Sequence, residues 1–346
     1  MARKPIRLGI VGGGFGAYGI AAACRRSGAF DPVAIAVRDL AKAKVVADRS
    51  CISRVLGDAQ ALIASPDIEA IAIAVPPPAQ EALALAAFAA GKPVLAEKPL
   101  ATDLATARRM AAAARAVPNM IDFLFPEIAA WRRAEAMLAA GEIGTIRHVV
   151  VDWRSESHDV RNRISSWKTD PRLGGGALAH MASHAFHYLE RFCGPAGSLQ
   201  AHLSGLNEIP NSETAAFVAL AFASGATANV TVSTSMPLAA SHSVTFYGSD
   251  GSLELSAQGP DPVGFRLLVG RRSTGSIDEI AVPQSSPPLA AGEDPRCVPL
   301  AALLDRFAEW VADGKAAAPT FADGARVQML IDGAQSSNRS GTRVLI

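Results

Sequence analysis

Three histidines within one predicted helix have the residue type and the spacing for proton transfer. His180, His184 and His187 lie four and three residues apart, so a helix places them on one face. An imidazole titrates near neutral pH, which suits a general acid or base. The helix rises roughly 10 Å from His180 to His187, too far for both to bind one metal ion at about 2 Å. No third ligand with a recognisable spacing accompanies a histidine pair, so we predict acid–base chemistry and no metal. Hydrogen bonding at a domain interface is the alternative for His180 and His187.

A glycine-rich turn near the N-terminus has the spacing that nucleotide phosphates require. Gly12, Gly14 and Ala17 match G-x-G-x-x-A directly after the apolar run from Leu8 to Val11. The first glycine forms the tight turn, the second lets a pyrophosphate approach the backbone, and the following helix supplies N–H donors. A second register begins at Gly14, but Gly12 is the residue that follows the strand; a plain glycine-rich turn is the alternative to both. The predicted dinucleotide-binding residues here are Gly12, Gly14, Phe15, Gly16 and Ala17.

The end of the second predicted strand bears on the choice between two nicotinamide cofactors. A carboxylate about 20 residues after the glycine turn would bind the ribose hydroxyls of NAD. Val37 stands at this strand end instead, and Arg38 follows it. A guanidinium can hold the 2′-phosphate of NADP and stack on adenine. We therefore predict NADP, with NAD as the alternative if Arg38 is a solvated charge and Asp39 binds the ribose.

The elements that must position these residues alternate between strand and helix over residues 1–122. Short, continuously apolar runs of Val, Ile and Ala are typical of strands buried on both faces. Ala-rich helical segments separate them, and strict alternation predicts a parallel, doubly wound α/β sheet of the Rossmann type. The predicted strands are 8–11, 33–37, 70–75, 94–96 and 120–123, and the predicted helices are 16–26, 41–49, 79–90 and 102–115.

Residues 123–346 have a different pattern and are predicted to form a second, α+β domain. A helix at 128–140 and a strand at 146–153 precede the histidine-bearing helix, and helices at 299–313 and 321–337 close the chain. Between them, five segments alternate apolar with polar or small residues, as in an antiparallel sheet with one covered face. These segments are 215–222, 226–235, 243–247, 252–256 and 265–269. We therefore expect a large, mostly antiparallel sheet in this domain.

Composition fits a globular protein of two domains and argues against several classes of partner. The chain has 346 residues, more than the roughly 250–300 at which a single core stops growing. Lys and Arg number 33 against 32 Asp and Glu, so we expect no binding to nucleic acid or to an anionic membrane surface. No apolar run reaches the roughly 18 residues of a membrane helix, and no signal peptide is expected. The four cysteines lie far apart, which indicates a reducing, cytoplasmic location without disulfides or a thiolate zinc site.

Longer motifs make the chain resemble the glucose-fructose oxidoreductase and inositol dehydrogenase (Gfo/Idh/MocA) family. Val75-Pro76-Pro77-Pro78 is similar to the family's cofactor loop, and Glu97-Lys98-Pro99 is similar to its E-K-P signature. The run from Gly174 to Leu178, leading into His184, is similar to its active-site helix. Segments 321–324 and 340–341 extend the resemblance over essentially the whole chain. E-K-P is the strongest motif because Lys98 lies outside the carboxyl edge of a parallel sheet, where ligands bind.

The resemblance implies an NAD(P)-dependent oxidoreductase that transfers a hydride between nicotinamide and a sugar-like or other hydroxy or keto substrate. It implies that Lys98 contacts the substrate oxygen, where an ammonium stabilises a developing alkoxide. His184 takes the acid–base position, and His180 is a second catalytic candidate. The second-domain sheet is implied to build a homodimer or homotetramer. The residues that the resemblance places along the cofactor are Val75, Pro76, Glu97 and Lys98.

Two tryptophans and one histidine are candidates for substrate contacts. Trp153 and Trp167 can stack on a sugar ring, although packing in the core or at an interface explains them equally well. His187 is the third candidate. His180 and His187 stand where family members that act on sugar alcohols commonly carry aspartates, which disfavours polyol oxidation of the inositol kind.

Two other classes of function remain open. One is a hydrolase of the same fold that uses bound NAD transiently and leaves its absorbance unchanged. The other is a non-catalytic protein that senses nucleotide. Lys98 and His184 argue against the second of these, because a sensor needs neither a cation at the substrate oxygen nor an acid–base group.

Overall fold

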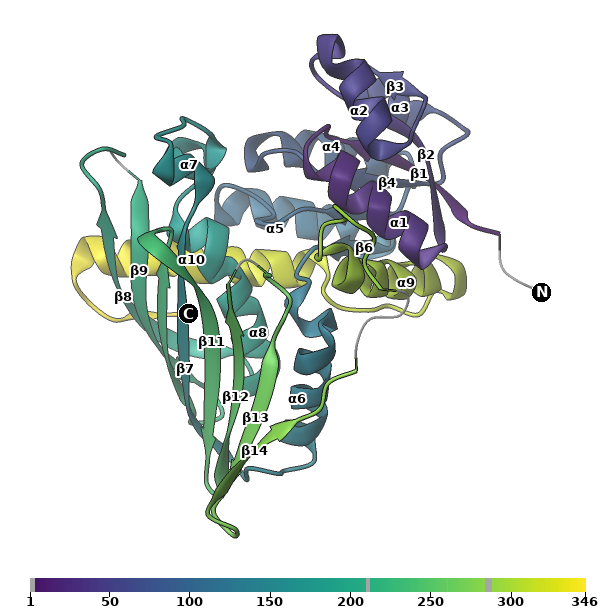
Figure 1. Ribbon diagram of the computed structural model, residues 1–346. Helices are drawn as coiled ribbons and strands as arrows, with labels where there is room; N and C mark the ends of the chain where they lie inside the picture. The colour runs from purple at the N-terminus through teal and green to yellow at the C-terminus, as the bar shows by residue number, and fades with distance from the viewer. Residues whose placement is uncertain (1–3, 210–211, 260, 284–287) are drawn as a thin grey trace. The chain divides into compact units, whose positions relative to one another are not determined.

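The chain folds into two compact units, which are drawn in Figure 1. The computed structural model describes residues 4–209, 212–259, 261–283 and 288–346. The first unit contains the described residues within 1–127 and 287–326, and the second contains those within 128–286 and 327–346. The expected boundary after residue 122 lies close to the structural one at 127. The expectation that all later residues form the second domain differs from the structure, because 287–326 belongs to the first unit.

The sheet of the first unit has six strands, all parallel. They are β1 (Ile6–Val11), β2 (Phe30–Ala36), β3 (Val55–Leu56), β4 (Ala70–Ile73), β5 (Val94–Ala96) and β6 (Asn119–Ile121). Their order is β3-β2-β1-β4-β5-β6, so the chain leaves the centre of the sheet and returns to it between β1 and β4. This confirms the doubly wound α/β fold, and such folds bind nucleotides where the strand order reverses.

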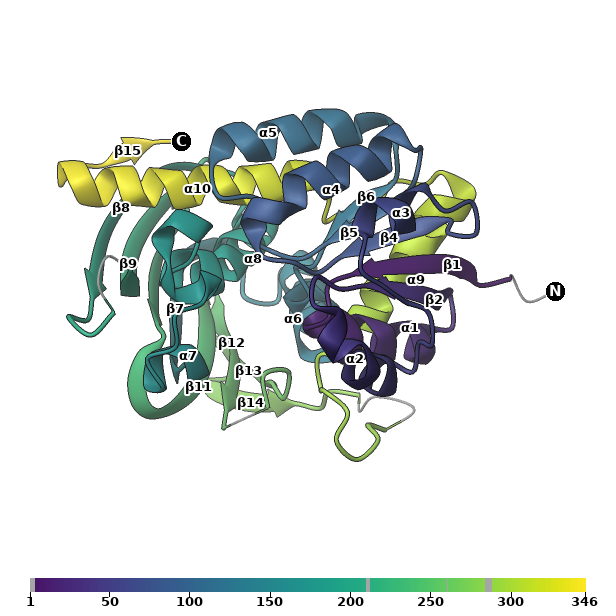
Figure 2. The same cartoon turned by 90° about the horizontal axis from the view of Figure 1, so that it is seen from above.

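Helices cover both faces of this sheet. They are α1 (Ala21–Ser27), α2 (Ala43–Ser50), α3 (Ala59–Ala64), α4 (Pro77–Ala89), α5 (Leu104–Ala113) and α9 (Cys297–Asp313). Figure 2 shows α4 and α5 on one side of the sheet and α1 and α9 on the other. A further helix, α10 (Phe321–Ser340), begins in the first unit and ends in the second.

Helix α9 explains why a late segment of the chain belongs to the first unit. Leu303 and Phe307 are completely buried in the same hydrophobic core as Ile10 of β1. Phe307 also stacks on Phe30 of β2, with 5.6 Å between the ring centroids. The period of the apolar residues predicts a helix here, but it carries no information about which sheet the helix will cover.

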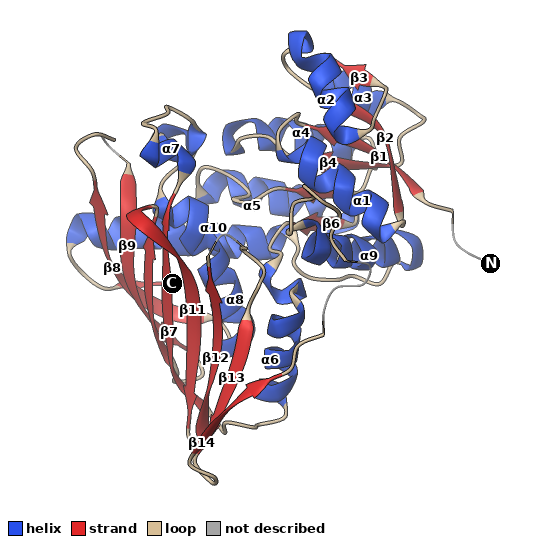
Figure 3. Cartoon of the chain, viewed as in Figure 1, coloured by secondary structure: helices blue, strands red, loops and turns tan. Residues whose placement is uncertain are grey.

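The second unit is built on a sheet of nine strands, most of them antiparallel, as expected. The strands are β7 (Ile146–Glu156), β8 (Ala196–Gly205), β9 (Glu213–Phe222), β10 (Thr227–Ser233), β11 (Ser235–Gly248), β12 (Gly251–Gln258), β13 (Arg266–Arg271), β14 (Ser276–Ile280) and β15 (Val344–Leu345). Their order is β14-β13-β12-β11-β7-β10-β9-β8-β15, and β7 and β10 are the neighbours that run parallel. Figure 3 shows these strands as one large sheet.

One face of this sheet is covered and the other is open. The helices of the unit are α6 (Ala129–Ala139), α7 (His158–Arg161) and α8 (Ser183–Cys193). Val244 and Phe246 of β11 are completely buried on the covered face. Phe217 and Tyr247 are 43% and 47% exposed, although they are large and apolar or aromatic. The alternation of the strands thus gives one core face and one face with accessible aromatic rings. Among the helices that the structure describes, none is both long enough and apolar enough to span a membrane.

Candidate active site

The glycine turn after β1 brings Gly12 against a neighbouring strand. Gly12 has a φ of 125°, which favours glycine, and a Cβ on it would lie 2.1 Å from the carbonyl oxygen of Ala74. Ala74 N donates to Val11 O at 2.8 Å, so the turn lies where the chain order of the strands reverses. No residue with a side chain fits at position 12, which is the physical reason for the first glycine of the motif.

Gly14 differs from Gly12 because the space beside it is open. A Cβ added to Gly14 would meet nothing within 4 Å. Two residues later a π-helical turn, η1 (Gly16–Ile20), begins and continues into α1, with Gly16 and Ala17 buried at its start. Exposed backbone beside the N–H groups of a helix start has the shape and polarity that a dinucleotide pyrophosphate requires. The turn therefore fits NAD or NADP.

Arg38 is exposed directly after β2, whereas Asp39 already has partners. Asp39 Oδ1 accepts a hydrogen bond from Ala41 N at 3.0 Å, and Asp39 Oδ2 lies 3.6 Å from Lys42 Nζ. Val37, at the strand end, is buried. This strand end therefore offers a guanidinium to solvent while the nearest carboxylate caps a turn.

Phe15 packs against a cation that no sequence motif marks. The guanidinium carbon of Arg296 lies 4.6 Å from the centroid of the Phe15 ring, which is a cation–π contact. Arg296 is the residue before α9, and its guanidinium pairs with Asp294 at 2.6 Å. Because residues 287–326 belong to the first unit, Arg296 adds a positive charge beside the glycine turn.

The remaining predicted cofactor residues lie at the carboxyl ends of β4 and β5. Val75 and Pro76 connect β4 to α4, and Glu97 and Lys98 follow β5. Glu97 N donates to Ile73 O at 2.9 Å, so the two strand ends lie side by side. Lys98 N donates to Glu97 Oε2 at 3.3 Å. The structure therefore gathers these four residues at one edge of the sheet, together with the glycine turn.

The three histidines of the second unit lie on a helix that is not uniform. Its first turn, η7 (Leu178–Ala182), is π-helical, and α8 follows. A π turn holds an extra residue, so the backbone around His180 is wound more widely than that around His184 and His187. His184 and His187 are buried within α8, and His180 is half-buried. The expected helix is present, but the turn that carries His180 is π-helical and not α-helical.

Each of the two predicted substrate tryptophans contacts one of these histidines. The Trp167 and His180 rings meet edge to face, with 6.5 Å between their centroids. The Trp153 and His184 rings are tilted, with 6.0 Å between their centroids. Both indoles are half-buried. The second unit therefore pairs each of the two predicted acid–base histidines with one predicted substrate tryptophan.

A half-buried glutamate lies at the start of the histidine-bearing helix. Glu213, the first residue of β9, accepts a hydrogen bond on Oε1 from Leu178 N at 3.2 Å. A Cβ on Gly176, whose φ is 108°, would lie 2.0 Å from this carboxylate, and one on Gly175 would lie 2.1 Å from Trp167 O. Burial raises the pKa of Glu213. The two glycines thus let the Trp167 loop (residues 165–170, including the short helix η5, Trp167–Thr169) and the Glu213 carboxylate lie against the start of the helix. Sequence reasoning missed this role of Glu213.

Trp153 also stacks against a second histidine, His242. His242 of β11 pairs with Trp153 of β7 in the antiparallel register, and their rings stack with 4.2 Å between centroids and 5° between planes. His242 Nε2 lies 3.1 Å from Tyr188 Oη, and Tyr188 is one helical turn after His184. Burial lowers the pKa of His242 to about 3. Its ring is therefore neutral near pH 7, and Trp153 contacts both this histidine and His184.

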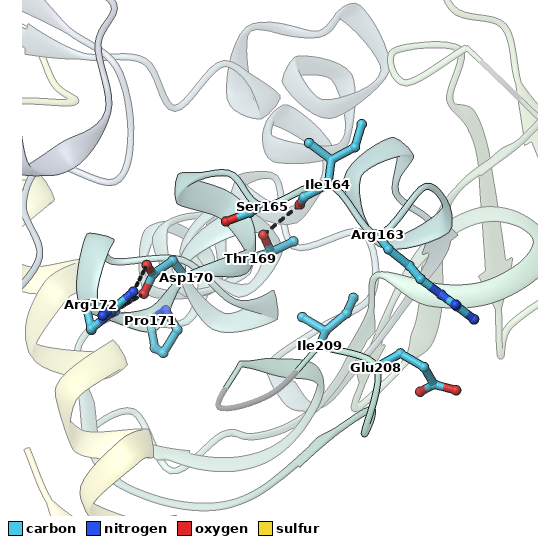
Figure 4. Close-up of a pocket in the computed structure, with 9 residues that line it drawn as sticks. All are labelled: Arg163, Ile164, Ser165, Thr169, Asp170, Pro171, Arg172, Glu208 and Ile209. Carbon is cyan, nitrogen blue, oxygen red and sulfur yellow. Dashed lines mark hydrogen bonds and ion pairs between the residues drawn. The ribbon is translucent and has the colours of Figure 1, made fainter.

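A half-open pocket of about 560 Å³ lies beside the Trp167 loop (Figure 4). Its lining includes two arginines and two acids, so its charges balance, and Arg172 pairs with Asp170 at 2.7 Å. None of the predicted catalytic residues lines it. In the described ranges, no group of three His, Cys, Asp or Glu side chains is arranged to hold a metal.

Comparison with known proteins places both units in one family. Residues 6–123 match the oxidoreductase family with an NAD-binding Rossmann fold, and residues 131–254 match the GFO/IDH/MocA C-terminal domain. An uncharacterized oxidoreductase from Synechocystis sp. is 30% identical over 96% of this chain and 94% of its own length. Inositol 2-dehydrogenase from Acidothermus cellulolyticus is 41% identical over 33% of each chain.

A solved structure with the same fold agrees with these matches. Levoglucosan dehydrogenase in complex with NADH and L-sorbose has a TM-score of 0.89 against this chain, with 22% identity and 99% of each chain covered. Similarity at this identity concerns the fold alone. The two domain matches and the relative that aligns over nearly the full length confirm the resemblance, and the chain belongs to the GFO/IDH/MocA family of oxidoreductases.

Proposed function

We propose that the protein is an NADP-dependent dehydrogenase or reductase, with NAD as the alternative cofactor, that acts on a CH–OH group. The observation that carries the proposal is Lys98, which follows β5 at the same sheet edge as the open glycine turn. The nicotinamide ring, when bound, supplies the hydride or accepts it. Gly12, Gly14, Phe15, Gly16 and Ala17 would hold the pyrophosphate, Arg38 the 2′-phosphate, and Val75, Pro76, Glu97 and Lys98 the nicotinamide half.

Two side chains would carry the chemistry on the substrate. Lys98 stabilises negative charge that develops on the substrate oxygen, because an ammonium is a preorganised electrostatic donor. His184 accepts the hydroxyl proton during oxidation and returns it to the carbonyl oxygen during reduction. His180 is a second acid–base candidate, on the half-buried turn that precedes α8.

We propose a carbohydrate or a carbohydrate derivative as the substrate. Trp153 and Trp167 offer aromatic faces beside the histidines, and aromatic faces pack well against sugar rings. His187 is the third proposed substrate residue. The names of the inositol and levoglucosan dehydrogenases among the similar proteins support a polyhydroxylated compound.

We also propose a homodimer or homotetramer and a cytoplasmic location. The open face of the nine-stranded sheet carries Phe217, Tyr247 and Val150, each more than a third exposed, and a second copy would cover such side chains. The four cysteines are unbridged, as expected in a reducing compartment.

The test is a screen of sugars, polyols and keto acids with NADPH, NADP, NADH and NAD, read as a change in nicotinamide absorbance. We expect turnover with at least one hydroxy or keto compound. In the Lys98→Met variant, turnover of that compound should fall by a factor of about 100 to 1000, with little change in nucleotide affinity. Product release without an absorbance change would favour the NAD-using hydrolase instead, and nucleotide binding without any reaction would favour a sensor.

A further inference from the structure

Two acidic residues stand side by side at the ends of neighbouring strands in the first unit. Glu97 follows β5 and Asp122 follows β6. The two strands pair in parallel, with Ala96 opposite Ile121, and Asp122 N donates to Ala96 O at 2.9 Å. The parallel register therefore brings both carboxyl groups to the edge that also carries Lys98.

Asp122 is buried and Glu97 is half-buried, and the two carboxyl groups lie close together. Asp122 is 3% exposed, and Glu97 Oε1 and Asp122 Oδ1 are buried atoms with no hydrogen-bond partner among the described residues. The two carboxyl groups are close enough to share a hydrogen bond, which lowers the pKa of Glu97 and raises that of Asp122. Asp122 is the more deeply buried of the two, and Glu97 already accepts from the backbone N–H of Lys98, so Asp122 is the better place for a proton. Two ionised carboxylates have no proton to share, so a hydrogen bond between these two groups requires one of them to be protonated.

The surrounding charges support a single negative charge on the pair. Burial raises the pKa of Asp122 well above its usual range, and the charge of Glu97 raises it further. Lys98 and Arg296 are the cations that face the pair and oppose this shift. Of the two cations, Lys98 opposes the shift more than Arg296 does, and Arg296 is itself paired with Asp294 at 2.6 Å. Two negative charges in contact within a buried site would repel strongly.

We propose that Glu97 and Asp122 hold one proton between them, carried by Asp122, and that Asp122 is a positioning residue for Lys98. The protonated Asp122 donates to Glu97, and Glu97 Oε2 in turn accepts from the backbone N–H of Lys98 at 3.3 Å. Loss of this proton at alkaline pH would leave two repelling carboxylates and would release Glu97 from its place. In this chain, the protonated Asp122, which follows the neighbouring strand β6, thus holds the E-K-P segment in place through Glu97.

The proton is tested directly in the wild-type protein. Infrared spectroscopy separates a protonated carboxyl group from carboxylates, and we expect a protonated carboxyl signal at pH 7 that disappears on alkaline titration. The difference between the wild type and Asp122→Asn should isolate this signal. Carboxyl-labelled aspartate in carbon NMR of the wild type gives the same answer without a variant. If every aspartate is ionised at pH 7, the proposal is overturned.

Nucleotide binding tests the positioning role, and this part rests on the proposed function because NADPH is the probe. Asparagine keeps a donor that cannot ionise, so Asp122→Asn should bind NADPH within about two-fold of the wild type at pH 7 and should not weaken at alkaline pH, as the wild type does. Asp122→Ala lacks the donor and should bind roughly ten-fold more weakly. An unchanged alkaline profile in Asp122→Asn, or equal affinities of the two variants, would refute the role.

The two readouts separate the possible failures. The carboxyl signal needs no ligand and no substrate, so its absence counts against the shared proton alone. Failure of the wild type to bind NADPH or NADH counts against the proposed function. A carboxyl signal with the expected pH dependence would then still establish the proton on Asp122.

Discussion

Histidines in this chain differ because their surroundings differ. His242 is stacked on Trp153, bonded to Tyr188 and buried, so its pKa falls to about 3 and it remains neutral in ordinary solution. Such a ring can hold an aromatic side chain in place but cannot exchange protons near pH 7. His184 of α8 contacts the same tryptophan, Trp153. His242 and His184 have the same side chain, and their different contacts make His242 a structural residue.

This contrast predicts unequal effects of substitution along the histidine-bearing helix. His184→Asn should lower turnover strongly, by roughly 100-fold or more, because it removes the proposed acid–base group. His180→Asn and His187→Asn should lower turnover far less. Steady-state kinetics of the three variants, with circular dichroism as the control for folding, measure this difference. Full activity in His184→Asn would contradict the proposed role.

Arg38 leads to a prediction about the cofactor. The wild type should bind NADPH more tightly than NADH, and Arg38→Ala should remove this preference, because one charged hydrogen-bond partner is typically worth about ten-fold or more in affinity. Lys42→Ala, which removes a cation paired with Asp39 on the same surface, is the matched control and should leave the ratio unchanged. Fluorescence titrations with both nucleotides give the ratio. Equal affinities in the wild type would disprove the preference.

The candidate-site residues that sequence reasoning proposes belong to local motifs, and it did not propose those that are brought there by the fold. Gly12, Gly14 and Lys98 stand in patterns that can be read directly from the chain. Asp122 and Arg296 stand in no motif. Asp122 acquires its surroundings from the pairing of β5 with β6, and Arg296 from the packing of the segment that carries α9. Contacts of this kind are not encoded by spacing within a single segment.

At the scale of elements, the glycine turn supports a prediction with a matched control. Gly14→Ala should fold normally, because its Cβ enters open space, yet it should weaken NADPH binding roughly ten-fold or more by occupying the space needed by the pyrophosphate. Gly197→Ala also enters nearly open space, with its nearest atom 3.9 Å away, but lies in β8 of the second unit. We expect it to bind NADPH like the wild type, as measured by isothermal titration calorimetry.

An unfolded Gly14→Ala protein or one with unchanged NADPH affinity would contradict this prediction. The first result would mean that position 14 is tightly packed, and the second that the pyrophosphate lies elsewhere. Gly12→Ala serves as the opposite reference. It should fail to fold well, because both its φ and the Ala74 carbonyl exclude a side chain.

Most helices and the buried strands were predictable because their apolar patterns are strong, whereas weakly patterned elements were not. The predicted strand at 94–96 coincides with β5, and the predicted helix at 128–140 is within one residue of α6 at each end. The strands β8 and β14 carry many polar or small residues and gave no signal. The π turn before α8 was also missed, because an extra residue per turn depends on packing rather than on apolar period.

At the scale of the whole molecule, the chain does not build its two units one after the other. The sheet within the first 127 residues has its core completed by α9. The apolar face with Leu303 and Phe307 is thus part of the first unit, although it follows strands β7 to β14 of the second sheet in the sequence. The first unit therefore depends on residues that are synthesised after most of the second unit. A boundary inferred from the change of pattern at residue 122 describes the secondary structure correctly but not the core.

Stability of the second unit should depend on pH through His242. Its pKa is about 3 in the folded protein, against roughly 6.5 in the unfolded chain, so the unfolded state binds more protons between these values. Stability is then highest above about pH 6.5 and falls as the pH decreases towards 3. From the two pKa values, this one group lowers the unfolding free energy by about 2 kcal/mol between pH 7 and pH 5.

Replacing His242 by phenylalanine keeps a flat ring against Trp153 and removes the proton-binding site. The loss of stability of His242→Phe between pH 7 and pH 5 should therefore be about 2 kcal/mol smaller than that of the wild type, whatever its stability at pH 7. Tyr188→Phe is the control, because it keeps the buried imidazole and should keep most of the pH dependence. Urea unfolding followed by tryptophan fluorescence reports mainly the second unit, which contains Trp131, Trp153 and Trp167. Equal losses in His242→Phe and the wild type would show that the folded protein accepts a proton at His242 as readily as the unfolded chain does, and the buried, neutral state of the ring would then be wrong.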